Sequence, residues 1–141
     1  MAERGVDRLL EFSIPARSDQ MGKMRAAVRE CVATSGCSET PTADIVLAID
    51  EACQNIIRHA YKGDPDGVIG LEIHRDGQNL VFTLIDTAPK IDPAKVKPRD
   101  LDDVRPGGLG THFIQKVMDQ AEFHPRPGDS GNLLRMVRRI E

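Results

Sequence analysis

Residues 51–61 read Glu51-Ala-Cys-Gln-Asn55-Ile-Ile-Arg-His59-Ala-Tyr61 and carry three polar residues at steps of four. Residues four apart lie above one another on an α-helix, so Glu51, Asn55 and His59 are expected to form one row. A carboxylate beside a carboxamide offers oxygen ligands that suit Mg²⁺, whose shell is completed by water and phosphate. Glu51 could then act as a base toward a hydroxyl group near the metal. Taken alone, the row is more typical of a polar helix edge with a few hydrogen bonds.

The helix that carries this row is predicted to begin at Thr40-Pro41, a capping residue followed by proline, and to run to about Tyr61. Apolar residues recur at helical spacing and predict a buried stripe along it. The stripe consists of Ile45, Ile49, Ala52, Ile56 and Ala60, widened by Val46, Cys53 and Ile57. The polar residues Asp50, Gln54 and Arg58 are expected on the opposite, solvated side.

The segments before this helix alternate in a way that predicts a strand and then another helix. Residues 9–15 place apolar side chains at every second position, which is typical of a half-buried strand. Ser18 is the expected cap of a helix that Gly36 ends. The buried side of that helix is predicted to hold Met21, Met24, Val28 and Val32 or Cys31.

The second half of the chain predicts a hairpin, a long connection, a helix and two final strands. Residues 68–74 and 80–85 are strands that turn around Asp76-Gly77. Residues 111–118 form a helix, and two strands follow it, at 121–124 and 133–137. This order of elements predicts an α+β fold: a two-layer sandwich with a mainly antiparallel sheet and helices packed on one face.

Two further features carry possible chemistry. Asp86 ends a strand, where a carboxylate can accept a hydrogen bond from an exocyclic amine such as that of adenine, although strand-ending turns also use aspartate. Gly107-Gly108-Leu109-Gly110-Thr111 opens a helix, whose first amides attract phosphate, although a plain helix cap has the same composition. The glycines are not a Walker loop, because no Gly-Lys-Ser/Thr follows them.

Composition excludes several classes of protein. The 141 residues are expected to form one domain over 1–141, and 29% charged with 40% apolar residues is typical of a globular chain. A net charge of -3 gives no basic excess for nucleic acid, and the basic run at 135–139 is predicted to be a terminal strand with one solvated face. No apolar run approaches the roughly 20 residues of a membrane helix. Residues 1–10 are charged and lack the apolar stretch of a signal peptide, so we expect a cytoplasmic protein. The three cysteines are odd in number and lack metal-ligand spacing, so we expect core thiols.

The order of these motifs is more specific than any one of them. The row from Glu51 to Tyr61, then Asp86, then the glycines at 107–110 resembles the Bergerat-type ATPase domain of gyrase B, Hsp90, sensor histidine kinases and MutL. The form Asn-x-x-x-His-Ala-Tyr and the closing Met118-Asp119 resemble most closely the anti-sigma-factor serine/threonine kinases of the RsbW and SpoIIAB type. The resemblance covers about residues 8–140.

This resemblance implies a set of site residues. Asn55 would hold Mg²⁺ against the ATP phosphates, Glu51 would orient or deprotonate the attacking hydroxyl, and Asp86 would read the adenine amine. A lid is expected over about 87–110, with its main part at 91–106. The residues expected to line the phosphates are Gly107, Gly108, Leu109, Gly110 and Thr111. His59 and Tyr61 are expected to support the helix end and the sheet, without a catalytic part.

The family also implies an activity and partners. The chain would be an anti-sigma factor that phosphorylates a serine or threonine of a STAS-type antagonist, would bind a sigma factor, and would form a homodimer. The adenine motif departs from the family: Ala88 replaces the first glycine of the motif, and adds a methyl group where the backbone would approach the base. This departure leaves an alternative, a non-catalytic regulatory module that binds nucleotide or partner and sequesters a sigma factor or STAS protein.

Overall fold

A computed structural model describes residues 6–61, 66–87, 106–125 and 131–141, and in it five strands form one sheet. The strands are β1 (Val6–Pro15), β2 (Val68–Asp76), β3 (Asn79–Asp86), β4 (Gln120–Pro125) and β5 (Asn132–Arg139). Their order is β1-β2-β3-β5-β4, and every neighbouring pair is antiparallel. The predicted hairpin is therefore confirmed, and β5 lies between β3 and β4.

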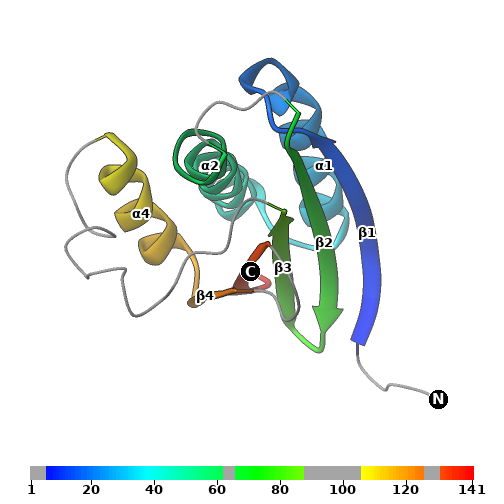
Figure 1. Cartoon of the computed structure of the whole chain (residues 1–141). Coiled ribbons are helices and arrows are strands. Elements are labelled where there is room, and N and C mark those ends of the chain that lie inside the picture. The colour runs from blue at the N-terminus through cyan, green and yellow to red at the C-terminus, as the bar shows by residue number, and fades with distance from the viewer. Residues whose placement is uncertain (1–5, 62–65, 88–105, 126–130) are drawn as a thin grey trace.

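The helices lie together on one face of this sheet (Figure 1). They are the short 3₁₀ helix η1 (Ser18–Gln20), α1 (Met21–Thr34), α2 (Glu39–Asn55), the π-helical turn η2 (Ile56–Ala60) and α4 (Pro106–Val117). The α+β sandwich predicted from the order of elements is confirmed.

Alternation along the strands explains why the helices cover only one face. Ile69, Leu71 and Ile73 of β2 are buried, whereas their neighbours in the strand are partly exposed. Side chains alternate between the two faces of a strand, so one face of β2 is apolar and the other is open to water. The same rule buries Phe82 and Leu84 of β3 against the helices. The core lies between these strands and the apolar sides of α1 and α2.

The helix starts differ from the prediction. Ser18 does not cap α1; its hydroxyl donates to Gln54 Oε1 at 3.2 Å, and the chain enters α1 through the 3₁₀ turn η1. Glu39 begins α2 and Ser38 precedes it in an extended conformation, so Thr40-Pro41 lies inside the first turn. At both starts a contact with a distant part of the chain is involved: the Ser18 hydroxyl bonds to Gln54, and Ser38 N donates to Glu141 O at 2.8 Å.

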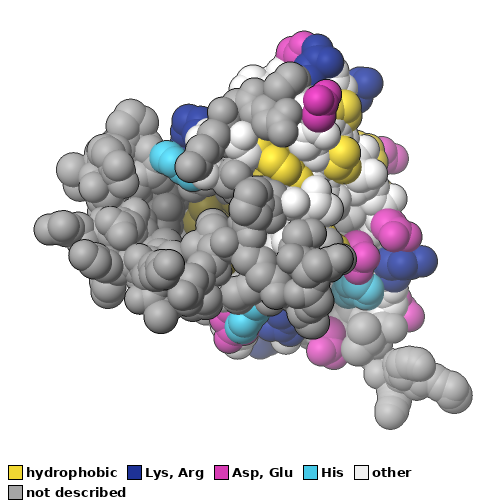
Figure 2. All heavy atoms as spheres, viewed as in Figure 1, with side chains coloured by type: hydrophobic (Ala, Val, Ile, Leu, Met, Phe, Trp, Pro, Cys, Tyr) yellow, Lys and Arg dark blue, Asp and Glu magenta, His cyan; other side chains and the backbone are white. Residues whose placement is uncertain are grey.

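One face of the molecule carries side chains of both charges (Figure 2). Figure 2 shows acidic and basic side chains interspersed among the coloured residues of this face. Among the helices of the described segments, none is long and apolar enough to cross a membrane.

Candidate functional site

Glu51 and Asn55 lie on α2 as predicted, and a cationic side chain bridges them. Arg58 Nη2 donates to Glu51 Oε2 at 3.1 Å and to Asn55 Oδ1 at 2.9 Å. Arg58 is exposed, as expected of a residue on the solvated side, and its guanidinium reaches back to both side chains. Positions three and seven residues apart share a helix face, so the sequence did contain the signal for this contact.

The turn that follows Asn55 changes the predicted row. Residues 56–60 form a π-helical turn, closed by a hydrogen bond from Tyr61 N to Ile56 O at 2.9 Å. Such a turn holds more residues than an α-helical turn, so it rotates the residues that follow around the helix axis relative to a continuous α-helix. His59 is exposed, whereas Glu51 and Asn55 are partly buried, and the Arg58 guanidinium contacts those two side chains.

Asp86 ends β3 on the face of the sheet that the helices cover. It is only 3% exposed, and Asn132 Nδ2 donates to its Oδ1 at 3.0 Å. Asn132 is 1% exposed and is the register partner of Asp86 across the β3–β5 pair. The sequence analysis did not identify Asn132, because only the pairing of β3 with β5 brings it to Asp86. A carboxylate fixed in this way is an acceptor of defined direction.

The glycine-rich motif belongs to α4 itself. Gly107, Gly108 and Gly110 lie in the first turns of a helix that starts at Pro106, not in a loop before it. Helix α4 packs against α2, which carries Glu51 and Asn55. The free amides of a helix start can bind phosphate oxygens. The side chains of residues 106–111, including Leu109 and Thr111, and the whole of 88–105 with Ala88 and most of the expected lid, lie outside the described residues.

The described donors fit Mg²⁺ and a nucleotide in chemical type. The Asn55 carboxamide oxygen accepts a hydrogen bond from Arg58, and an oxygen of this type is one that Mg²⁺ binds. In the described segments no group of three or more His, Cys, Asp or Glu side chains could hold a metal alone. Mg²⁺ commonly uses one or two protein oxygens together with phosphate and water, so a lone carboxamide beside a nucleotide suits it.

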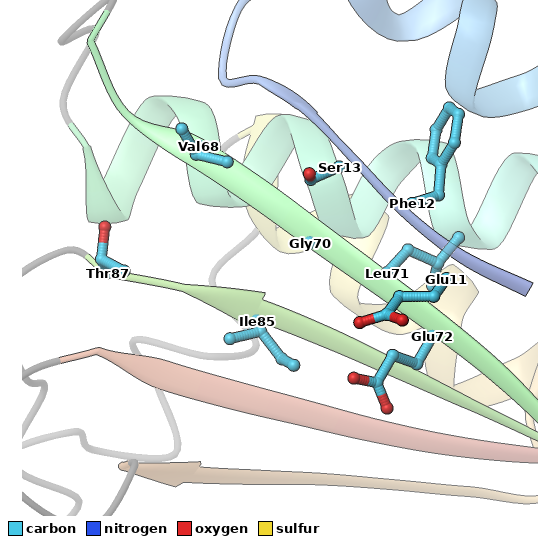
Figure 3. A pocket seen from close by; sticks show the side chains of 9 residues that line it. All are labelled: Glu11, Phe12, Ser13, Val68, Gly70, Leu71, Glu72, Ile85 and Thr87. Carbon is cyan, nitrogen blue, oxygen red and sulfur yellow. The ribbon is translucent and has the colours of Figure 1, made fainter.

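A separate hollow lies on the open face of the sheet (Figure 3). It encloses about 510 Å³ and is lined by Glu11, Phe12, Ser13, Val68, Gly70, Leu71, Glu72, Ile85 and Thr87. The register partners Glu11 and Glu72 place two carboxylates at one end of it. Two negative groups repel a triphosphate, and Asp86 points to the other face, so this hollow is not the candidate nucleotide site.

Comparison with known proteins gives a family and relatives. The family model of the histidine kinase-like ATPase domain matches residues 14–138. Serine-protein kinase RsbW of Halalkalibacterium halodurans is 28% identical over 140 residues, which cover 94% of this chain and 83% of that protein. Serine-protein kinase RsbW of Bacillus subtilis is 25% identical over 128 residues, covering 84% and 79%.

Solved structures agree on the fold. The RsbU and RsbW domains of a Mycobacterium tuberculosis protein match with a TM-score of 0.66 and 22% identity, over 93% of this chain and 31% of that one. The catalytic domain of the histidine kinase ThkA matches with a TM-score of 0.61 and 12% identity, over 93% and 96%. The resemblance inferred from the motifs is confirmed: this chain belongs to the histidine kinase-like ATPase domain family and is similar to the RsbW serine-protein kinases.

Proposed function

We propose that this protein is an ATP-dependent protein serine/threonine kinase and anti-sigma factor, which phosphorylates a STAS-type antagonist. The observation that carries the proposal is the Glu51–Asn55 pair on α2, held together by one cationic nitrogen. Relatives named serine-protein kinase support the phosphotransfer activity. The STAS antagonist and the sigma factor come from the family resemblance, as does a homodimer, and a cytoplasmic location is proposed from the composition of the chain.

Each site residue has a binding task. Asn55 holds Mg²⁺ through its carboxamide oxygen, and Asp86 accepts a hydrogen bond from the adenine amine. The free amides at the start of α4, those of Gly107 and Gly108, bind phosphate oxygens, and Leu109, Gly110 and Thr111 line the same end of the helix. Ala88 is the residue that the family motif assigns to the contact with the base. The bound metal supplies charge neutralisation to the phosphates. Phosphoryl transfer needs mainly such placement and charge stabilisation from a protein.

Glu51 acts as the base. A serine or threonine oxygen of the antagonist attacks the γ-phosphorus, the bond from that phosphorus to the β–γ bridging oxygen breaks, and ADP leaves. The hydroxyl proton goes to the Glu51 carboxylate. Glu51 is suited to this task because its side chain is 28% exposed and therefore accessible to an incoming hydroxyl.

The proposal is tested by incubating the protein with labelled ATP and a STAS protein whose gene lies near its own, and by measuring the label on the STAS protein. We expect label on the STAS protein with the unaltered chain, and loss of both nucleotide binding and transfer in Asn55→Ala. Glu51→Ala should retain nucleotide and lose transfer, because it removes only the base. Gln54→Ala is the matched control, since Gln54 is a neighbour of Asn55 that bonds to Ser18.

Other outcomes would revise the proposal. Equal loss of nucleotide binding and transfer in Glu51→Ala would make Glu51 a structural residue. A tight complex with the STAS protein and no transfer would favour the non-catalytic module. A monomer at micromolar concentration, measured by mass in solution, would remove the homodimer.

A further inference from the structure

The Tyr61 hydroxyl joins three parts of the chain at the end of the candidate site. Tyr61 follows η2 and is only 9% exposed. Its hydroxyl donates to Val68 O at 2.7 Å and accepts from Thr87 N at 2.8 Å and Val68 N at 3.3 Å. A phenolic hydroxyl has one donor and two acceptor positions, so these backbone groups use its whole capacity. Thr87 Oγ1 lies at 3.1 Å as well.

The ring of Tyr61 is held as closely as its hydroxyl. A Cβ atom added at Gly67 would lie 2.7 Å from the ring atoms Cδ1 and Cε1, which is closer than real Cβ contacts come. Gly67 is thus needed for the close approach of the ring and the backbone. Gly67 O in turn accepts from Ala16 N at 2.8 Å, next to the end of β1. The ring therefore packs against a backbone that is itself tied to the sheet.

The π-helical turn fixes where Tyr61 stands relative to Asn55. The hydrogen bond from Tyr61 N to Ile56 O closes η2, and Asn55 is the residue just before that turn. Such turns are often found at functional positions in helices. One short, hydrogen-bonded segment therefore runs from the predicted metal ligand to the Tyr61 hydroxyl.

Thr87 connects the Tyr61 hydroxyl to Asp86, the residue proposed to read adenine. It directly follows Asp86, where β3 and its ladder with β2 end. Beyond the ladder, the Thr87 amide is held by the Tyr61 hydroxyl instead of by a strand. The backbone on either side of Asp86 is thus held, by β2 and β5 before it and by Tyr61 after it.

We propose that Tyr61 is a positioning residue for base recognition, which sets the direction of Asp86 and links it to the helix that carries Asn55. This role rests on the proposed function, because Asp86 must read adenine for the direction of its carboxylate to matter. We expect Tyr61→Phe to bind ATP about tenfold more weakly, because this variant loses the hydroxyl that holds the Thr87 and Val68 backbone. GTP has no amine at the position that Asp86 reads, so its affinity should change little and the preference for ATP should fall.

The experiment combines nucleotide affinity with hydrogen exchange. ATP and GTP compete with a fluorescent ATP analogue, and amide exchange at Thr87 is followed by mass spectrometry or NMR. Ser35→Ala is the control, because it removes one part-buried hydroxyl, bonded to Cys31 O at 2.8 Å, near the opposite end of β2. Gly67→Ala is a second test variant that keeps the hydroxyl and displaces the ring.

The expected result is faster Thr87 exchange and a smaller ATP preference in both Tyr61→Phe and Gly67→Ala, with Ser35→Ala unchanged. Unchanged exchange at Thr87 would overturn the proposal. Faster exchange with unchanged ATP preference would also overturn it, since Tyr61 would then only stabilise the fold. Failure of the unaltered chain to bind any nucleotide would instead overturn the proposed function, and this role with it.

Discussion

At the scale of single residues, Arg58 changes the chemistry expected of α2. Its guanidinium lies between the two side chains predicted to serve as base and metal ligand, at 3.1 Å from Glu51 and 2.9 Å from Asn55. The Arg58 side chain is 40% exposed and that of Glu51 28%, so water weakens the pair and it can open. A metal that binds Asn55 must compete with this cation.

Replacement of Arg58 by glutamine should therefore raise the apparent affinity for Mg²⁺ in the presence of nucleotide. We expect about a threefold to fivefold increase, the size of a partly exposed ion pair. A titration of nucleotide binding against Mg²⁺ measures it. Arg25→Gln is the control, because Arg25 pairs at 2.8 Å with Asp50, on another side of α2. A lower apparent affinity for Mg²⁺ in Arg58→Gln than in the control would mean that Arg58 assists the binding of Mg²⁺.

Asn132 is the second residue with a testable effect. Its side chain donates to the buried Asp86 carboxylate, and loss of a buried donor costs about 1–3 kcal/mol. Asn132→Ala should lower the free energy of unfolding by this amount and weaken ATP binding, as measured by urea unfolding and nucleotide titration. His124→Ala, on the exposed side of the neighbouring strand β4, should change neither. Unaltered ATP affinity in Asn132→Ala would show that Asn132 does not orient Asp86.

At the scale of elements, tight turns connect the helices and strands that form the site. Helix α1 ends at Thr34 and Gly36 follows at φ 112°, while Gly77 turns the β2–β3 hairpin at φ 64°. Side chains tolerate the small left-handed region near φ +60° far better than larger positive values. A side chain is therefore expected to destabilise the fold more at Gly36 than at Gly77.

Alanine at each glycine measures this difference. Gly77→Ala should cost about 1 kcal/mol, because Gly77 lies in the left-handed region and a Cβ there meets nothing within 4 Å. Gly36→Ala should cost more, about 2–3 kcal/mol, because its φ lies outside that region. Thermal unfolding of both variants provides the comparison. The opposite order would show that α1 can end without the positive φ of Gly36.

At the scale of the whole molecule, the core encloses cysteine thiols, which react readily when they are exposed to solvent. Cys53 is fully buried and Cys37 is 8% exposed, and both thiols are free. Burial raises the pKa of the Cys53 thiol strongly, and the nearby Asp50 carboxylate raises it further. Burial also raises the pKa of Cys31, with Glu30 adding to the shift. The expectation of core thiols is confirmed for Cys37 and Cys53, whereas Cys31 is partly exposed at the edge of the core.

Alkylation by iodoacetamide at pH 8 should follow this order. A raised pKa leaves less thiolate at a given pH, and only the thiolate reacts. We expect Cys31, which is partly exposed, to react first and Cys53 to react only when urea unfolds the chain. Peptide mass spectrometry identifies the labelled sites. Labelling of Cys53 at the rate of Cys31 in the folded protein would mean that α2 opens locally.

Several features of the site follow from local spacing and could be predicted from the sequence. The alternation at Ile69, Leu71 and Ile73 assigns β2 and its buried face because a strand has a period of two. The step of four between Glu51 and Asn55 places both on one side of α2 for the same kind of reason. Arg58 was also within reach of this reasoning, since its contacts lie three and seven residues away.

The sequence by itself determined the elements, the buried faces and the pair on α2, because each depends on neighbours within a few residues. Only the tertiary structure decided that Asn132 meets Asp86 and that the Tyr61 hydroxyl holds Thr87. Asn132 and Asp86 are 46 residues apart, and they meet because β5 pairs with β3 and not only with β4. Tyr61 and Thr87 are 26 residues apart, and they meet where the β2–β3 ladder ends beside the turn η2. The order of strands in a sheet is chosen by the burial of whole faces against the helices, which no local spacing records.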